Sequence, residues 1–201
     1  MMTRDSVAGF ILIGGAASRM GSDKSQLLIE NETFVQRIAR ELALVTAQVS
    51  VVGRPEQFDP GLPVVYDLHP QWGALGGVHG ALANCASEWA LIVACDLPQV
   101  KGALFERLLS LRSGFEAVAP LQPDGRRQPL CALYRVVECL PRAAAMIESG
   151  ERKPVALLQS VRTRWVQFAE LADLPGAEDF FDNINTPQDY LRISRETDRL
   201  D

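Results

Sequence analysis

Short apolar runs alternate along this chain with segments whose apolar residues recur at helical spacing. The first run, from Val7 to Ile13, ends at Gly14-Gly15, a pattern typical of a strand that is buried on both faces and followed by a loop. Thr33 with Gln36 resembles a capping box, and apolar residues at helical spacing follow it. We therefore expect a helix from about Thr33 to Leu44.

The same pattern recurs several times further along the chain. We expect strands at QVSVVG from Gln48, PVVYD ending at Asp67, EWALIVACD from Glu88, FEAVAP from Phe115, PLCALYR from Pro129 and RTRWVQF from Arg162. We expect helices at GVHGALANC from Gly77, Leu104 to Leu111, Val137 to Ser149, and Pro187 to about Arg195.

Strands that alternate with helices predict an α/β fold with a mostly parallel sheet covered by helices on both faces. In such folds the ligand cleft is built by loops at the carboxyl ends of the strands. No repeat, low-complexity segment or linker interrupts the pattern, so we expect one domain over residues 1–201.

Composition narrows the function classes further. Hydrophobic residues make up 47% of the 201 residues and charged residues 22%, as in ordinary globular proteins. The net charge of −5 gives no basic field that would recruit nucleic acid or an anionic membrane. No apolar run has the roughly 18 residues that span a bilayer, and the first residues lack signal-peptide features, so we expect a cytoplasmic protein. The four cysteines contain no C-x-x-C pair and are interpreted as structural thiols rather than zinc ligands.

The segment ILIGGAASRMGSDKSQLL, from Ile11, is suited to binding an anion. Its glycines Gly14, Gly15 and Gly21 let backbone amides approach phosphate oxygens, while Arg19 and Lys24 add positive charge. The segment has neither the G-x-x-x-x-G-K-[ST] pattern nor the G-x-G-x-x-G pattern. A dinucleotide oxidoreductase is therefore disfavoured. A glycine-rich turn with two solvated cations is the alternative interpretation.

Polar residues that follow other predicted strands are candidates for the same cleft. Asp96 follows a buried strand, where its carboxylate suits Mg²⁺, although it could instead cap a turn. Asn183 and Asn185 alternate across Ile184, so in an extended segment both amides point to the same side, unless they only form turns or caps. Trp72 could stack on a ring or simply pack. We interpret His69 and His79 as surface or hydrogen-bonded histidines.

The motifs together resemble the molybdenum cofactor guanylyltransferases, within the larger nucleotidyltransferase family. A buried strand, then GG and S-R-M-G-x-D-K, is similar to that family's opening signature. The family's order continues in YDLHPQWGALGGVHGAL from Tyr66, ACDLPQV from Ala94, GRRQPLCALYR from Gly125 and NINTPQDY from Asn183. The chain departs from the family pattern at Ile13, where alanine is usual, and at Ala74, where proline is usual; both could reshape the base pocket.

The resemblance implies a three-layer, Rossmann-like nucleotidyltransferase fold and transfer of GMP from GTP to the terminal phosphate of molybdopterin, with release of pyrophosphate. It implies Mg²⁺ as cofactor and other proteins of molybdenum cofactor synthesis as candidate partners. The implied roles are catalysis by Arg19, Lys24, Asp96 and Asn185; nucleotide binding by Leu12, Ile13, Gly14, Gly15, Lys24, Asp67, Gly76, Gly77 and Asp96; metal binding by Asp96; and second-substrate contacts by Arg126, Arg127 and Asn183.

Three alternatives remain open at this stage. A molybdopterin cytidylyltransferase or a sugar-phosphate nucleotidyltransferase of the same fold would retain the glycine-rich loop and Asp96 but differ in its base pocket and acceptor surface. A non-catalytic GTP-binding partner of cofactor enzymes would bind GTP and Mg²⁺ without releasing pyrophosphate. For Asp67 and the pair Gly76 and Gly77, roles in turn formation and in relieving a tight helix start compete with nucleotide binding.

Overall fold

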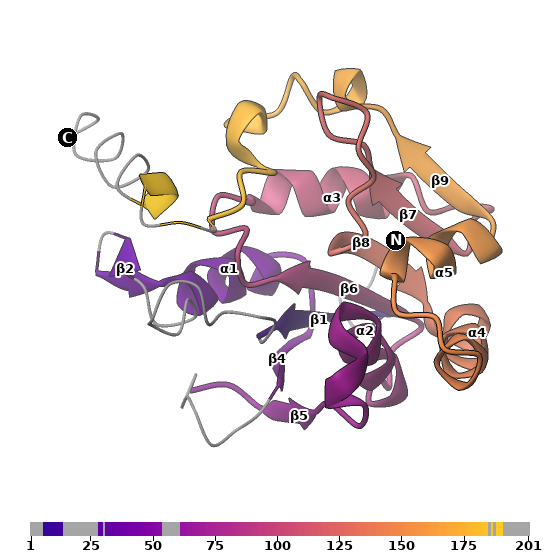
Figure 1. The fold of residues 1–201 in the computed structure, drawn as a ribbon. Coiled ribbons are helices and arrows are strands. Elements are labelled where there is room, and N and C mark those ends of the chain that lie inside the picture. Colours follow the sequence, from indigo (N-terminus) through magenta and orange to yellow (C-terminus); the bar gives the residue numbers. More distant parts are fainter. Residues whose placement is uncertain are drawn as a thin grey trace.

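A computed structural model describes residues 6–13, 28–29, 31–53, 61–184, 186 and 188–190 of the chain. Within these residues, seven strands form one twisted sheet in the order β5-β4-β1-β6-β8-β7-β9 (Figure 1). Their bounds are β1 Val7–Leu12, β4 Gln48–Gly53, β5 Val64–Tyr66, β6 Trp89–Ala94, β7 Ala117–Pro120, β8 Cys131–Arg135 and β9 Thr163–Val166. A separate two-stranded pair joins β2 (Leu28–Ile29) to β3 (Glu32–Thr33).

All strands of the large sheet run in one direction except β8. β1 pairs in parallel with β4 and β6, β4 with β5, and β7 with β9, whereas β8 is antiparallel to both β6 and β7. The amino end of β8 therefore lies at the same edge as the carboxyl ends of the other strands. The expected mostly parallel sheet is confirmed.

Helices cover both faces of the sheet and make the fold three-layered (Figure 1). The helices are α1 (Phe34–Ala43), α2 (Gly73–Ala83), α3 (Gly102–Ser110), α4 (Val136–Glu148) and α5 (Pro154–Ser160). Short 3₁₀ segments occupy η5 (Pro70–Trp72), η6 (Phe168–Glu170) and η7 (Ala177–Asp179). Because successive strand residues face opposite sides, Ile11 packs into the core under α1 and α3, while Phe10 and Leu12 pack into the core under α2, α4 and α5.

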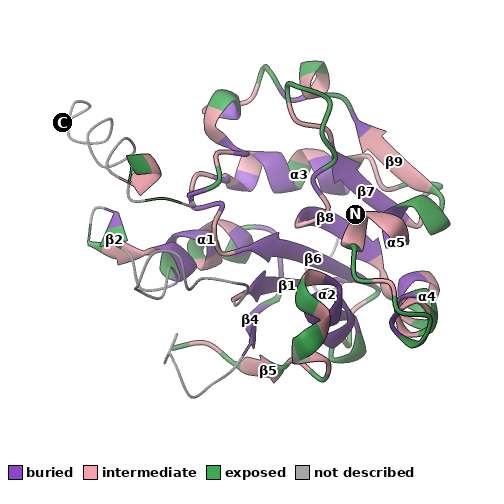
Figure 2. Ribbon diagram, in the orientation of Figure 1, coloured by how far each residue is buried: buried purple, intermediate pink, exposed green. Residues whose placement is uncertain are grey.

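The central strands β1, β4, β6, β7 and β8 are almost entirely buried, whereas the edge strands β5 and β9 are mainly half-buried, as the purple and pink arrows of Figure 2 show. All six residues of β6 are buried, which accounts for its continuous apolar sequence, since a parallel strand covered on both faces has no solvent side. The order of the central strands reverses at β1, and a cleft at the carboxyl ends on either side of β1 is the usual ligand position in such sheets.

Most expected elements are present within one or two residues of their predicted bounds. The capping box of α1 is confirmed: the Thr33 hydroxyl accepts from the Gln36 amide, and the Gln36 side chain accepts from the Thr33 amide. α2 begins at Gly73, four residues before the predicted start. α5 and the β2-β3 pair were not predicted from the sequence. The closing helix falls largely outside the described residues, although residues 188–190 are helical.

No helix among the described residues has the length and apolar character needed to cross a membrane.

Candidate active site

The carboxyl edge of the sheet brings several predicted site residues together. Leu12 is in register with Ala94 of β6 and with Val52 of β4. Beyond the strand ends, the Cys95 amide donates to the Leu12 carbonyl at 3.0 Å, and the Ile13 amide donates to the Val52 carbonyl at 2.9 Å. The chain that leaves β1 toward the glycine-rich segment therefore starts beside the chain that leaves β6 toward Asp96.

Asp96 lies next to the segment that carries the predicted asparagines. Its backbone carbonyl accepts a hydrogen bond from the Ile184 amide at 3.0 Å. Ile184 is fully buried with Ile29 and Phe34, whereas its neighbour Asn183 is exposed and Asp96 is half-buried. Two segments almost ninety residues apart in the sequence thus meet at the end of β6.

The chemistry of this edge fits Mg²⁺ held partly by a substrate. Within the described residues, no cluster of three or more His, Cys, Asp or Glu side chains is arranged to hold a metal ion. Mg²⁺ does not require such a cluster, because it keeps several waters and is commonly bound by one or two carboxylates together with substrate phosphates. A single half-buried carboxylate at Asp96 matches that mode of binding.

Asp67 follows β5 and organises the turn that leads to α2. Its Oδ1 accepts the His69 amide at 2.7 Å, so the turn-forming role is present. The turn packs against Gly76, where a Cβ atom would lie 2.4 Å from the His69 carbonyl oxygen and 3.2 Å from Asp67 Oδ1. Only a residue without a side chain allows this close approach, which brings the two predicted nucleotide-binding residues Asp67 and Gly76 together.

Gly77 lies beside Leu12. A Cβ atom on Gly77 would lie 3.4 Å from Leu12 Cδ1, an ordinary contact. The predicted nucleotide-binding residues of β1 and α2 are therefore neighbours in the structure.

His79 differs from its expected role as a surface or hydrogen-bonded histidine. It is buried, its ring lies 5.1 Å from the His69 ring, and its Nδ1 has no hydrogen-bond partner among the described residues. Burial and the neighbouring His69 lower the pKa of His79, and Asp67 opposes that shift. The side chain therefore favours the neutral form.

Ile13, one of the two departures from the family pattern, packs onto Gly53 at the end of β4. A Cβ atom on Gly53 would lie 2.4 Å from Ile13 Cγ1 and 2.8 Å from the Ile13 carbonyl oxygen. The isoleucine side chain therefore occupies the space that a side chain at position 53 would need.

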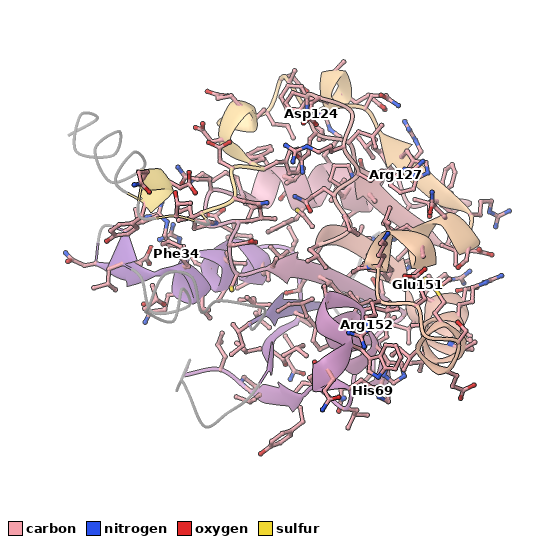
Figure 3. All side chains as sticks on the ribbon, viewed as in Figure 1. Phe34, His69, Asp124, Arg127, Glu151 and Arg152 are labelled. Carbon is pink, nitrogen blue, oxygen red and sulfur yellow. The ribbon has the colours of Figure 1, made fainter. Side chains whose placement is uncertain are left out.

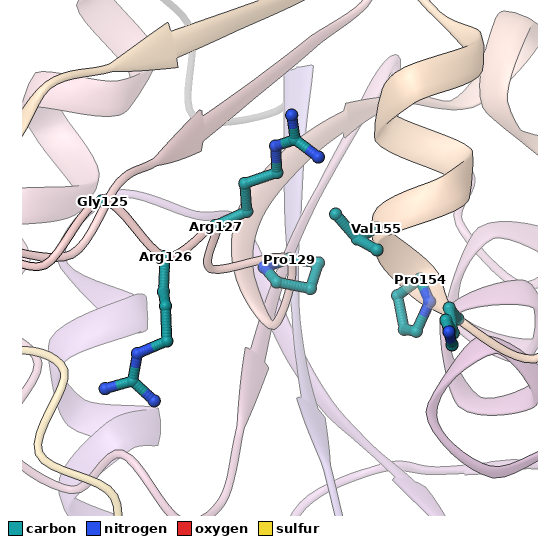
Figure 4. A pocket seen from close by; sticks show the side chains of 7 residues that line it. Gly125, Arg126, Arg127, Pro129, Pro154 and Val155 are labelled. Carbon is teal, nitrogen blue, oxygen red and sulfur yellow. The ribbon is translucent and has the colours of Figure 1, made fainter.

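A cavity of about 600 Å³ opens at the amino end of β8 (Figure 4). It is lined by the predicted second-substrate residues Arg126 and Arg127 and by Gly125, Pro129, Lys153, Pro154 and Val155. Figure 4 shows the two arginine side chains pointing in opposite directions. Arg126 pairs with Asp124 at 2.5 Å, and the Arg127 guanidinium lies 5.1 Å from the centre of the Trp165 ring.

Three further residues that complete the cavity were not predicted from the sequence: Lys153, at the end of the connection between α4 and α5, and Pro154 and Val155, the first residues of α5. A basic pair before a proline, in ERKP after a helix, was the available signal. The cavity adjoins the end of β6, because Leu130, next to Pro129, accepts the Ala94 amide at 2.8 Å.

Several predicted site residues lie outside the described residues: Gly14, Gly15, Arg19, Gly21, Lys24 and Asn185. Their roles stay predictions. The structure describes the residues before and after the glycine-rich segment. They show only that this segment follows β1 and leads to β2, which begins at Leu28.

The chain is similar to known nucleotidyltransferases. The family model described as the MobA-like NTP transferase domain matches residues 9–165. A probable molybdenum cofactor guanylyltransferase of Pelotomaculum thermopropionicum is 32% identical over 195 residues, which covers 95% of this chain and 94% of the relative. A molybdenum cofactor guanylyltransferase of Vibrio cholerae is 30% identical over 187 residues, with 91% and 89% covered.

Solved structures agree in fold. Molybdopterin-guanine dinucleotide biosynthesis protein A from Archaeoglobus fulgidus superposes with a TM-score of 0.80 at 23% identity, covering 96% of this chain and 99% of that one. The 2-C-methyl-D-erythritol 4-phosphate cytidylyltransferase of Thermus thermophilus gives a TM-score of 0.68 at 17% identity, with 94% and 98% covered. From the matched model and the full-length relatives, the chain belongs to the MobA-like NTP transferase domain family and is a nucleotidyltransferase.

Proposed function

We propose that this enzyme transfers GMP from GTP to the terminal phosphate of molybdopterin, forming molybdopterin guanine dinucleotide and releasing pyrophosphate. The names of its full-length relatives support this assignment. The structural observation that carries it is the hydrogen bond between Ile184 and Asp96, which brings a carboxylate and an asparagine-bearing segment to the edge where the chain leaves β1. Catalysis there would consist mainly of positioning and charge stabilisation.

The nucleotide would lie along the carboxyl edge from β6 to β5. Backbone amides of Gly14 and Gly15, with Arg19 and Lys24, would neutralise the β- and γ-phosphates. Leu12, Ile13, Asp67, Gly76 and Gly77 would contact the nucleoside. The strand order β5-β4-β1-β6 supports this direction, because it puts the end of β4 between Ile13 and Asp67.

Asp96 would hold Mg²⁺, and Asn185 would orient its waters or the phosphate oxygens. When bound, Mg²⁺ supplies positive charge that offsets the negative charge of the phosphate oxygens. The residues of this chain would then keep the α-phosphorus of GTP exposed to the second substrate. They would hold the departing pyrophosphate on the far side of that phosphorus, in line with the attacking phosphate oxygen.

The second substrate would place its phosphate monoester in the cavity beside β8. Arg126, Arg127 and the added Lys153 line this cavity. Although Arg126 pairs with Asp124, the excess of positive charge favours a dianionic phosphate. Asn183, next to the Ile184 that bonds Asp96, would be a further contact. The reacting oxygen of a phosphate monoester is already an anion near neutral pH, so no side-chain nucleophile is needed and no strong general base is required.

We also propose that residues 1–201 form one domain, that the protein acts in the cytoplasm, and that other proteins of molybdenum cofactor synthesis are its partners. The continuous sheet and the two cores that run across it support the single domain.

Pyrophosphate release measured with each of the four nucleoside triphosphates, with and without molybdopterin, tests the proposal. We expect release with GTP that depends on both molybdopterin and Mg²⁺, and large losses in Lys24→Ala and Asp96→Ala. Preference for CTP would make the protein a cytidylyltransferase. Binding of GTP without pyrophosphate release under any condition would make it a non-catalytic partner.

A further inference from the structure

Trp72 makes a contact that the proposed chemistry does not use. The guanidinium carbon of Arg152 lies 5.0 Å from the centre of the Trp72 ring, within the range of a cation–π interaction. Trp72 is half-buried at the end of η5, directly before α2, and Arg152 is exposed in the connection between α4 and α5. In Figure 3 the labelled Arg152 lies beside α2, near the labelled His69. The contact therefore joins two segments about eighty residues apart.

On the side of Trp72, the contact leads to the nucleotide-binding turn. The Trp72 amide donates to the His69 carbonyl at 2.9 Å, and that same carbonyl packs on Gly76. The His69 amide donates in turn to Asp67 Oδ1. The backbone of Trp72 is thus held against the turn that carries Asp67.

On the side of Arg152, the contact leads to the cationic cavity. Glu151 Oε1 accepts the backbone amides of Arg152 at 2.8 Å and Lys153 at 2.9 Å, which holds the start of this connection in one conformation. These two hydrogen bonds lower the pKa of Glu151, so the carboxylate stays ionised at neutral pH. Lys153, next to Arg152, lines the cavity together with Arg127.

We propose that Trp72 is a positioning residue for the second substrate: through Arg152 it holds Lys153 and the cavity wall at a fixed place relative to the nucleotide-binding turn. This inference rests on the proposed role of the cavity. It assigns Trp72 a function other than stacking on the base, because the Arg152 guanidinium lies over a face of the ring. Loss of the contact should weaken capture of the second substrate while leaving nucleotide binding unchanged.

Steady-state kinetics with GTP, Mg²⁺ and molybdopterin test the assignment in Arg152→Ala, Trp72→Leu and Trp72→Phe. We expect Arg152→Ala and Trp72→Leu to raise the KM for molybdopterin roughly two- to fivefold, the effect of one exposed cation–π contact. The KM for GTP and kcat at saturating molybdopterin should stay at the parent values. Trp72→Phe, which keeps an aromatic face, should restore most of the loss.

Arg112→Ala is the matched control. Arg112 lies 5.9 Å from the ring centre of Trp89, which begins β6 at the opposite edge of the sheet. The Arg112→Ala substitution removes the same kind of cation–π contact at a place away from the cavity, so both KM values should stay unchanged.

An unchanged KM for molybdopterin in Arg152→Ala would overturn the assignment, as would a rise in the KM for GTP in Trp72→Leu, which would indicate base stacking. An equal rise of the KM for molybdopterin in Arg112→Ala would also overturn it, because the effect would then come from a general loss of stability. Failure of the parent enzyme to release pyrophosphate with any nucleotide would instead contradict the proposed function, and the assignment with it.

Discussion

The Ile184 amide donates a hydrogen bond to the Asp96 carbonyl at 3.0 Å. This bond uses the backbone of Asp96 and brings exposed Asn183 beside the end of β6. Because the Ile184 side chain is fully buried, the core fixes the position of this segment against Asp96. The geometry that the proposed metal and phosphate chemistry requires is therefore a product of packing as well as of the motifs themselves.

Replacing the Asp96 carboxylate by an amide should abolish most activity without disturbing this backbone contact. We expect Asp96→Asn to lower kcat on the order of 100-fold or more, because the carboxylate that would hold Mg²⁺ against the phosphates is lost. The measurement is pyrophosphate release with saturating GTP and molybdopterin over a range of Mg²⁺ concentrations.

Glu88→Gln provides the control for that substitution. Glu88 precedes β6 at the opposite edge of the sheet and pairs with Arg135 at 2.9 Å. Glu88→Gln removes one negative charge at the other end of the same strand, and the variant should retain full activity. Equal losses in the two variants would contradict a specific role for Asp96.

Gly76 and Gly77 should respond oppositely to the same substitution. Alanine at Gly76 would place Cβ 2.4 Å from the His69 carbonyl oxygen, so the backbone of the Asp67 turn must move. We expect Gly76→Ala to cost about 1–3 kcal/mol of stability and to raise the KM for GTP. Alanine at Gly77 meets only Leu12 at 3.4 Å and gains helix propensity, so it should be neutral or stabilising by up to about 1 kcal/mol.

Urea unfolding measures the stability of the two alanine variants, and kinetics at varied GTP concentration measure their KM for GTP; together they test this prediction. Equal stabilities would show that the close approach of Gly76 to the turn is not needed for the fold. A normal KM for GTP in a folded Gly76→Ala protein would separate the turn from nucleotide binding.

The buried Tyr134 hydroxyl supports one wall of the cavity. It donates to the Pro129 carbonyl at 2.7 Å, and Pro129 lines the cavity. Tyr134→Phe should cost about 1–3 kcal/mol, since it leaves a carbonyl oxygen without its partner. It should also raise the KM for molybdopterin more than that for GTP. Thermal unfolding together with the two KM values tests this prediction, which would fail if both KM values stayed at the parent level.

Two buried thiols predict loss of stability in alkali. Burial raises the pKa of Cys131 from 9.0 to about 12, and burial with nearby Glu138 and Glu116 raises that of Cys139 to about 12. Between these values the unfolded chain loses thiol protons that the folded protein keeps, so stability present below pH 9 declines as the pH rises toward 12. Each cysteine contributes a slope of about 1.4 kcal/mol per pH unit.

Urea unfolding of the parent and of Cys131→Ala across this range measures the thiol contribution. The variant should be less stable at pH 8 because a buried side chain is truncated, but its stability should fall less steeply above pH 9. Parallel curves for the two proteins would contradict the raised pKa of Cys131.

Sequence patterns were sufficient to predict the central strands of the large sheet, such as β1 and β6, because these strands are almost entirely buried and carry continuous apolar runs. The less buried edge strands β5 and β9 were predicted from short segments rich in β-branched residues or of alternating character. Sequence patterns did not identify β8 as antiparallel, since PLCALYR has the same apolar character as its parallel neighbours. They missed α5 because its seven residues are too few for a helical period to stand out.

The site shows the same division. Asp96 and Asp67 were recognisable because each follows an apolar run, and the order of the motifs indicated the family. The sequence could not reveal that Trp72 contacts Arg152 or that Lys153 joins Arg127 in one cavity, because only the tertiary fold brings these distant segments together.

A crystal structure of the protein with a non-hydrolysable GTP analogue and Mn²⁺, located by its anomalous signal, tests the central claim most directly. We predict Mn²⁺ within coordination distance of the Asp96 carboxylate, the triphosphate on the segment between β1 and β2, and the nucleoside extending toward Asp67. Nucleotide and metal bound elsewhere, with the carboxyl edge between β1 and β6 empty, would contradict the account.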